Sequence, residues 1–206
     1  GDLPILNGVD LAVKEKEIVS IVGSSGAGKT TLLQILGTLD QPSSGELRID
    51  QANPFELNQN ELSAFRNQKL GFIFQFHQLL PEFTAVENVM LPGLIRGDAK
   101  KQAKERAEML LGKIGLQDRL NHKPSELSGG EQQRAAVCRA LFNEPKIIFG
   151  DEPSGNLDTK NSQELHELFF KLREEFNQTF VIVTHNKELA AMADRTLTMK
   201  DGNFIQ

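Results

Sequence analysis

A glycine-rich turn between an apolar strand and an apolar helix constrains this chain more than any other stretch of its sequence. The β-branched run Ile18–Val22 enters the turn, and the helical pattern of residues 32–36 leaves it. Glycines let the backbone curl so that successive N–H groups point at one anion, and a helix start adds the positive end of its dipole. Lys29 supplies a cation for the β- and γ-phosphates, and the Thr30 hydroxyl suits Mg²⁺. The stretch therefore predicts a loop that binds a nucleoside triphosphate through Gly23, Ser24, Ser25, Gly26, Ala27, Gly28, Lys29, Thr30 and Thr31.

Length and composition narrow the class of protein. The chain has 206 residues, 39% hydrophobic and 25% charged, which is typical of one globular domain with a sizeable core. A formal net charge of −5 gives no general attraction to nucleic acid or to an anionic membrane. Cys138 is the single cysteine, so an internal disulfide is ruled out. Because neither a leader nor an apolar run of membrane-spanning length is visible, we expect a partner to supply any membrane span.

Strand and helix patterns alternate along most of the chain. Strands are predicted at residues 9–13, 18–22, 46–50, 71–74, 146–151, 179–184, 196–199 and 203–205, and helices at 60–67, 99–114, 131–142 and 187–192, with another carrying Leu165, Leu168, Phe169, Leu172 and Phe176 on one face. This order predicts an α/β fold with a mostly parallel sheet and N-terminal antiparallel elements. Prolines punctuate a mainly helical middle section. We expect one domain with its core at 1–75 and 131–206 and a helical insertion at 76–130.

Polar side chains follow four of the predicted strands. Parallel sheets bind ligands beyond the carboxyl ends of their strands, where Gly23, Gln75, Asp151 and His185 fall. An acid fixed there could hold Mg²⁺ near the phosphates, so Asp151 is the predicted metal ligand.

Three side chains beside this acid are candidates for the chemistry itself. Glu152 could orient and deprotonate the attacking water, Gln75 could reach a metal-bound water and the γ-phosphate, and a ring nitrogen of His185 could contact a γ-phosphate oxygen. The alternatives are an exposed Asp-Glu turn, a surface glutamine and a structural histidine. His77, His122 and His166 lack metal-site spacing and are interpreted as structural or surface groups.

The run from Leu127 to Arg134 contains a second pair of adjacent glycines. Ser128 and Glu131 have the spacing of a capping box at the start of the next helix. That role does not explain Gly129 and Gly130, which weaken a helix and leave bare N–H groups at its positive end. We therefore predict a second anion site at Ser128, Gly129 and Gly130.

Taken in order, these motifs resemble the ATP-binding cassette (ABC) ATPases over essentially the whole chain. The Leu-Ser-Gly-Gly run between a phosphate loop and an Asp-Glu strand end is highly specific to that superfamily. The resemblance implies a head-to-tail homodimer, in which ATP lies between residues 23–31 of one subunit and residues 128–130 of the other. It implies Glu152 as catalytic base, His185 as γ-phosphate contact and Asp158 in the loop that crosses between subunits. Gln75 and the helical insertion would face integral membrane permease subunits.

A narrower resemblance lies in residues 62–89 together with Gly155-Asn156-Leu157-Asp158. These residues are similar to the branch that contains lipoprotein-releasing, MacB-type and FtsE-type ATPases, and closest to the lipoprotein-releasing members. The resemblance implies a translocase peripheral to the cytoplasmic face of the inner membrane. The alternatives are an exporter ATPase, a cell-division ATPase and, from another class, an ABC ATPase acting on DNA or ribosomes. Against this last class, residues 31–127 lack coiled-coil heptads and the chain has one cassette.

One position departs from the family pattern. ABC ATPases usually stack an upstream aromatic ring on adenine, whereas this chain has no Tyr or Trp and no Phe before Phe55. We expect the residue to belong to a segment lost before Gly1, and stacking on the base is not assigned.

Overall fold

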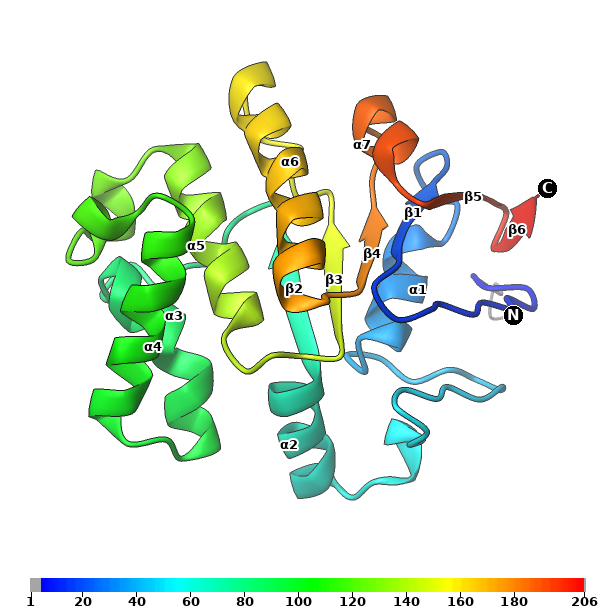
Figure 1. Cartoon of the computed structure of the whole chain (residues 1–206). Coiled ribbons are helices and arrows are strands. Elements are labelled where there is room, and N and C mark those ends of the chain that lie inside the picture. The colour runs from blue at the N-terminus through cyan, green and yellow to red at the C-terminus, as the bar shows by residue number, and fades with distance from the viewer. Residues whose placement is uncertain (1–4, 206) are drawn as a thin grey trace.

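The computed structural model describes residues 5–205, and a six-stranded sheet lies at its centre (Figure 1). The strand order is β2-β3-β4-β1-β5-β6. The strands are β1 (Ile18–Val22), β2 (Leu70–Phe74), β3 (Ile147–Asp151), β4 (Phe180–Val183), β5 (Arg195–Lys200) and β6 (Asn203–Ile205). Neighbouring strands from β2 to β5 run parallel, and β6 pairs antiparallel with β5. The carboxyl ends of β1, β2, β3 and β4 therefore meet at one edge.

Helices cover both faces of this sheet. They are α1 (Lys29–Leu36), α2 (Gln59–Lys69), α3 (Ala85–Arg96), α4 (Lys100–Lys113), α5 (Gly129–Leu141), α6 (Thr159–Phe176) and α7 (Lys187–Met192), with 3₁₀ turns at Pro54–Glu56, Gln117–Arg119 and Pro124–Glu126. One face packs on α5, α6 and α7 through a buried cluster that includes Ile148, Phe169 and Phe180. The other packs on α1 through Leu32 and Leu33. Burial on both faces explains why β1, β3 and β4 read as nearly continuous apolar runs.

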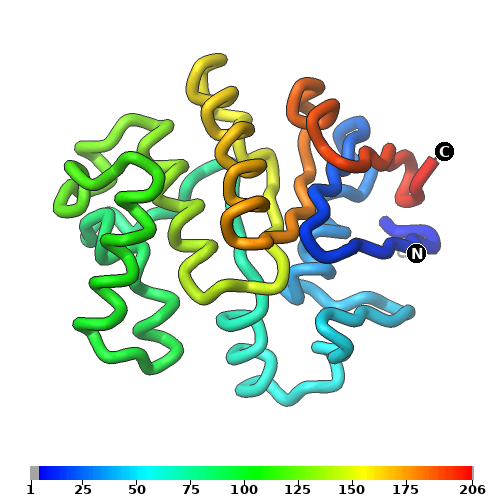
Figure 2. Tube along the Cα trace, in the orientation of Figure 1, coloured from blue at the N-terminus to red at the C-terminus, as the bar shows by residue number. Residues whose placement is uncertain are grey.

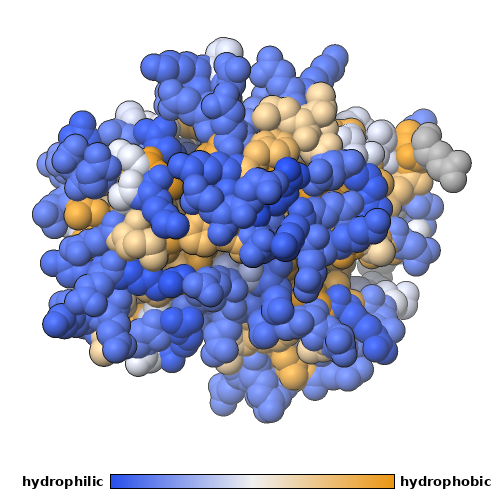
Figure 3. Space-filling model, in the orientation of Figure 1, coloured by the Kyte–Doolittle hydropathy of each residue, from blue (hydrophilic) through white to orange (hydrophobic). Residues whose placement is uncertain are grey.

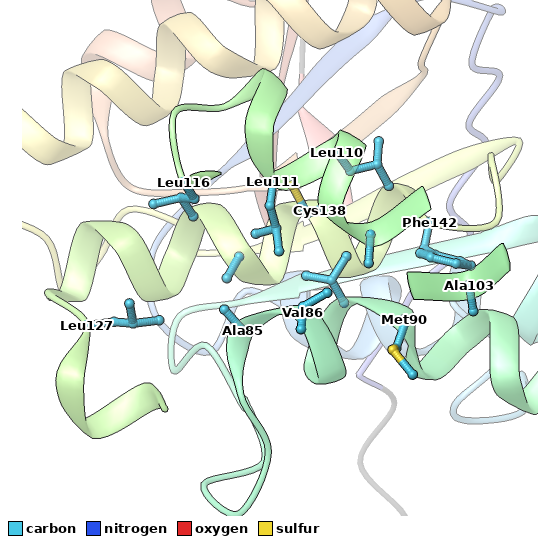
Figure 4. Packing of buried hydrophobic residues seen from close by; sticks show 13 residues of the cluster. Ala85, Val86, Met90, Ala103, Leu110, Leu111, Leu116, Leu127, Cys138 and Phe142 are labelled. Carbon is cyan, nitrogen blue, oxygen red and sulfur yellow. The ribbon is translucent and has the colours of Figure 1, made fainter. Parts of the chain in front are cut away.

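A helical arm, residues 76–127, lies at one side of the sheet (Figure 1). Its helices α3 and α4 have their own buried cluster, which they share with α5. Figure 4 shows Val86 and Met90 of α3, Leu110 and Leu111 of α4, and Cys138 of α5 converging. Helix α5 also contributes Val137 and Leu141 to the sheet-facing cluster, so it connects the arm to the sheet.

The two ends of the described chain lie close together beside β5 and β6 (Figure 2). The N–H of Asn7 donates to the carbonyl of Gly202 over 2.8 Å. Gly202 in turn donates to the carbonyl of Ala27 over 3.0 Å. Both termini are thereby tied to the glycine-rich turn.

Two of the predicted strands are wrong. Residues 9–13 and 46–50 form no strand in the structure, and β5 with β6 is the antiparallel pair found within residues 5–205. Val9, Val13 and Ile49 do pack against the sheet, which explains their alternation. Alternation indicates burial on one side, but a strand also needs the backbone of a neighbouring strand to pair with its N–H and C=O groups. In these two segments the backbone pairing is limited to the isolated bridge between Ile49 and Ala52.

The structure also contains α3, which the sequence pattern did not reveal. The other predicted elements lie within a few residues of their predicted positions. The face that carries α6 is mostly hydrophilic (Figure 3). In residues 5–205 no helix has both the length and the apolar content needed to cross a bilayer.

Candidate functional site

A cleft of about 660 Å³ opens at the carboxyl edge of the sheet. It brings together the turn after β1 and the predicted residues that follow the other strands. Its lining residues are Ile5, Gly23, Ser25, Gly26, Ala27, Gly28, Lys29, Thr30, Thr31, Gln75, Asp151, Glu152, Val183 and His185. The predicted gathering of Gly23, Gln75, Asp151 and His185 is therefore present. Among the described residues, no phenylalanine ring lines the cleft.

The turn after β1 depends on glycine at two positions. A Cβ at Gly23 would overlap the carbonyl oxygen of Met199 on the neighbouring strand. Gly28 is the N-cap of α1 with φ 102°, in the left-handed region, and no side chain caps the helix. An uncapped helix start that faces a cleft offers its N–H groups and its dipole to an anion.

The ammonium group of Lys29 folds back over the turn. Its Nζ donates to the carbonyl oxygens of Gly23 and Ser24, each over 2.8 Å. These two bonds hold the cation at the mouth of the loop, within the space where anionic oxygens would lie. A phosphate group would therefore exchange these two carbonyl contacts for charge-assisted ones.

Two adjacent acids, Asp151 and Glu152, and the histidine His185 line the same cleft. Burial raises the pKa of Asp151, the negative charge of Glu152 raises it further, and Lys29 opposes both effects. Glu152 has a φ of 46°, a left-handed conformation fixed by its N–H bond to the Val183 carbonyl over 2.8 Å. Its carboxylate accepts from the backbone N–H of His185 over 3.1 Å, and Nδ1 of His185 lies 2.8 Å from Oε1. Glu152 is thus held in one orientation from two sides.

Gln75 lines the cleft, and the NH₂ group of its side-chain amide is paired. Its Nε2 donates to Oδ1 of Asn156 over 2.9 Å, and the amide of Asn156 returns a bond to the Gln75 carbonyl over 3.3 Å. Asn156 therefore holds the Gln75 side chain against the turn that follows β3. Sequence reasoning did not identify this role for Asn156, because the two residues lie 81 positions apart.

Ser128, Gly129, Gly130 and Asp158 do not line this cleft. Ser128 and Glu131 form the predicted capping box, since Ser128 Oγ accepts from the Glu131 N–H and Glu131 accepts from the Ser128 N–H. Backbone and Arg119 hydrogen bonds lower the pKa of Glu131 to about 2. Asp158 caps α6 and accepts from the backbone and amide of Asn161. In its own subunit, this second group of predicted site residues is engaged in helix capping.

The two adjacent glycines differ in what surrounds them. A Cβ at Gly130 would overlap Oδ1 of Asn161 and lie 2.7 Å from its Cγ, so close packing against α6 requires glycine here. A Cβ at Gly129 would meet only Leu157 at 3.7 Å, which is an ordinary contact. Packing within the subunit thus gives a reason for glycine at position 130 that the sequence did not reveal, and it gives none at position 129.

Fold and cleft together define a phosphate-loop nucleotide-binding protein with a parallel sheet. The sequence profile of the ABC transporter family matches residues 6–155, and the chain belongs to that family. A solved ATP-binding cassette, a dimer in a post-hydrolysis state bound to ADP and Pi, superposes with a TM-score of 0.88 at 42% identity. That alignment covers 98% of this chain and 89% of the solved one.

Two curated relatives are similar over nearly their whole length. The lipoprotein-releasing system ATP-binding protein LolD of Bacteroides fragilis is 60% identical over 205 residues, covering 100% of this chain and 95% of the relative. The LolD protein of Porphyromonas gingivalis is 62% identical over 202 residues, covering 98% and 92%. The predicted family, fold class and ATPase activity are confirmed.

Proposed function

We propose that this chain is the ATP-binding subunit that powers a lipoprotein-releasing transport system. The observation that supports it is one cleft lined by the phosphate loop, Asp151, Glu152 and His185, with the last two in contact. The specific system is supported by the relatives named above, whose identity of about 60% extends over the full chain. ABC family membership already makes the protein an ATPase coupled to transport.

The cleft has the donor set that suits Mg²⁺ bound together with a triphosphate. The hydroxyl of Thr30 and the carboxylate of Asp151 are hard oxygen ligands, and Gln75 offers an amide oxygen. Within residues 5–205, no three His, Cys, Asp or Glu side chains form a ready metal cage. This fits Mg²⁺, which proteins usually bind through one or two carboxylates plus substrate phosphates. When bound, Mg²⁺ would neutralise charge developing on the β- and γ-phosphate oxygens.

In the proposed mechanism, the chain's own residues position the reactants. The N–H groups at the start of α1 and the ammonium of Lys29 hold the phosphates. Glu152 orients a water for in-line attack on the γ-phosphorus and accepts its proton, while the bond from phosphorus to the β–γ bridging oxygen breaks. His185 keeps Glu152 in place through the 2.8 Å contact and would present its other ring nitrogen to a γ-phosphate oxygen.

Under the same proposal, a second copy of the chain meets the nucleotide. The residues through which it would do so are Ser128, Gly129, Gly130 and Asp158. Helix α5 begins at an exposed serine and two glycines, outside the cleft of its own subunit. In a head-to-tail homodimer, this helix start would close over the triphosphate held by the other subunit. Because Gly129 has free space around it, a requirement for glycine there would come from the partner rather than from the subunit's own packing.

We further propose that the loop after Gln75 and the adjoining insertion, residues 76–130, receive the membrane subunits. Phe76 is 71% exposed, and Leu80 and Phe83 are also exposed on this loop. Large apolar side chains exposed together on one loop suit contact with another protein. The chain would then sit peripherally at the cytoplasmic face of the inner membrane.

Steady-state hydrolysis by Glu152→Gln tests the assignment of the base. The variant is expected to bind ATP with unchanged affinity, because the amide keeps the shape of the side chain. Its turnover should fall at least about 100-fold, since proton acceptance from water is lost. Glu188→Gln, an exposed carboxylate on α7, is the matched control and should hydrolyse ATP normally. Normal turnover in Glu152→Gln would overturn the assignment.

A further inference from the structure

Gln133 of α5 is a fully buried polar side chain that the mechanism above does not use. It is 0% exposed. Its Nε2 donates to the carbonyl of Pro153 over 2.6 Å and to the carbonyl of Phe74 over 3.2 Å. Pro153 directly follows Glu152, and Phe74 directly precedes Gln75. One side chain therefore joins the backbones beside two predicted site residues.

These bonds also fix which end of the amide faces where. Both contacts of Nε2 are with carbonyl oxygens, which can only accept, so the NH₂ group must lie there. The amide oxygen then faces Nδ1 of His77, which must carry a proton to donate to it. Gln133 thus makes three directional contacts, and a side chain lacking either donors or acceptor cannot reproduce them.

The same helix holds the loop after β2 at further points. Arg139 donates to the carbonyls of His77 and Gln78 over 2.9 and 2.7 Å. Segment 74–78 is therefore fastened to α5 by both Gln133 and Arg139. Since α5 begins at Gly129 and rises about 1.5 Å per residue, Gln133 lies roughly 5 Å along the axis from the glycine pair.

We propose that Gln133 is a positioning residue that makes the loop of Gln75, the turn of Glu152 and the start of α5 move as one unit. The inference rests on the proposed function, because it concerns how the base and the γ-phosphate contacts are placed. A displacement of Gln75 by nucleotide or by a membrane partner is passed through Phe74, Gln133 and Pro153 to Glu152. Loss of this connection misplaces the base without touching the phosphate loop.

The chain contains a matched control for a purely structural role. Gln178 is 3% exposed, and its Nε2 also donates to two carbonyls, those of Pro145 and Thr179. Those bonds lie at the opposite edge of the sheet, where β4 begins. Gln133→Met and Gln178→Met each remove two buried donors at constant side-chain length. Both variants should therefore be destabilised in a similar way. Only Gln133→Met also breaks the connection between the loop of Gln75 and the turn of Glu152.

The experiment uses the full-length protein with its membrane subunits and measures kcat and KM for ATP, together with amide hydrogen exchange. Gln133→Met should lower kcat by about 10- to 100-fold, the range that a misplacement of about 1 Å produces, with KM changed less than about threefold. Exchange should accelerate in residues 74–80 and 152–158 but not in α6. Gln178→Met should retain kcat within about twofold.

Three results would overturn the inference. One is a kcat near that of the wild type in Gln133→Met, another is an equal loss in both variants, and the third is exchange that accelerates uniformly along the chain. Gln133→Glu keeps the acceptor for His77 and replaces only the donors, so it repeats the test if the Met variant does not fold. Absence of ATPase activity in the wild type would instead refute the proposed function, which keeps the two failures distinct.

Discussion

Replacing each of the two adjacent glycines by alanine separates packing within the subunit from contact with a second subunit. At Gly130 the new methyl group would overlap Asn161 and lie 2.7 Å from its Cγ, so Asn161 must move. That movement breaks the bond from its amide to Asp158, which is 2.7 Å long. Gly130→Ala therefore damages the junction between α5 and α6.

The magnitudes follow from packing and helix propensity. Adding a methyl group to a tightly packed site costs about 1–3 kcal/mol, and alanine in place of glycine returns about 0.5–1 kcal/mol in a helix. Gly130→Ala should lose about 1–2 kcal/mol of unfolding free energy, or about 2–8 °C in melting temperature for a domain of this size. Gly129→Ala meets only Leu157 at 3.7 Å, so its stability should equal or slightly exceed that of the wild type.

The assay combines urea denaturation with sedimentation of the ATP-bound protein in a Glu152→Gln background. Gly129→Ala should unfold like the wild type yet form fewer ATP-dependent dimers, because its methyl group would enter the partner's phosphate site. If Gly130→Ala is as stable as the wild type, the packing argument fails. If Gly129→Ala dimerises normally, glycine at that position has no role at the subunit contact.

Three further predictions test other contacts of the site. Lys29→Ala should lose triphosphate binding by at least about 100-fold in calorimetry, and unchanged affinity would remove Lys29 from the phosphate site. Ser128→Arg should bind ATP as a monomer but fail to dimerise. The control Thr84→Ala, which removes the same kind of cap from α3, should dimerise normally. ATP-dependent dimers of Ser128→Arg would refute the shared site. Glu131, with its pKa lowered to about 2 from 4.5, should contribute about 1–2 kcal/mol of stability that is present above pH 4.5 and lost as the pH falls toward 2. Denaturation midpoints of Glu131→Gln and wild type at pH 7 and pH 2.5 measure this contribution, and a difference independent of pH would contradict it.

Much of the cleft could be predicted because its parts are local in sequence. A strand, a glycine-rich turn and a helix start occupy residues 18–36, and each acid or histidine lies within two residues of the end of the strand that positions it. The rule that parallel strands end at one edge then assembles these segments without knowledge of the strand order. The sequence therefore placed Asp151, Glu152 and His185 beside the phosphate loop, as observed.

Helix α3 was missed because its periodicity is interrupted. Pro92 lies inside the helix, where it has no N–H for the carbonyl of Asn88. The Pro92 carbonyl accepts from Asn67 and Asn143, which are distant in sequence. The Thr84–Glu87 capping box was the available local signal.

Contacts between loops could not be predicted from the sequence, for a different reason. Asn156 was noted only as part of a motif, and the pairing of Gln75 with it depends on how two turns approach each other in space. Gln133 likewise lies within a helical run. Periodicity predicts whether such a side chain is buried or exposed, but not which groups it contacts. Neither pattern nor propensity tells which carbonyl a buried amide will meet.

The observed pairing of Gln75 with Asn156 orients the Gln75 amide and links two loops under the proposed function. Nε2 donates to Asn156 over 2.9 Å, which leaves the amide oxygen of Gln75 as the group that would serve Mg²⁺ or a metal-bound water. Asn156 lies two positions before Asp158, in the loop assigned to the subunit contact. A shift of Gln75 when the triphosphate binds would therefore be passed through this one hydrogen bond to the loop that meets a second subunit.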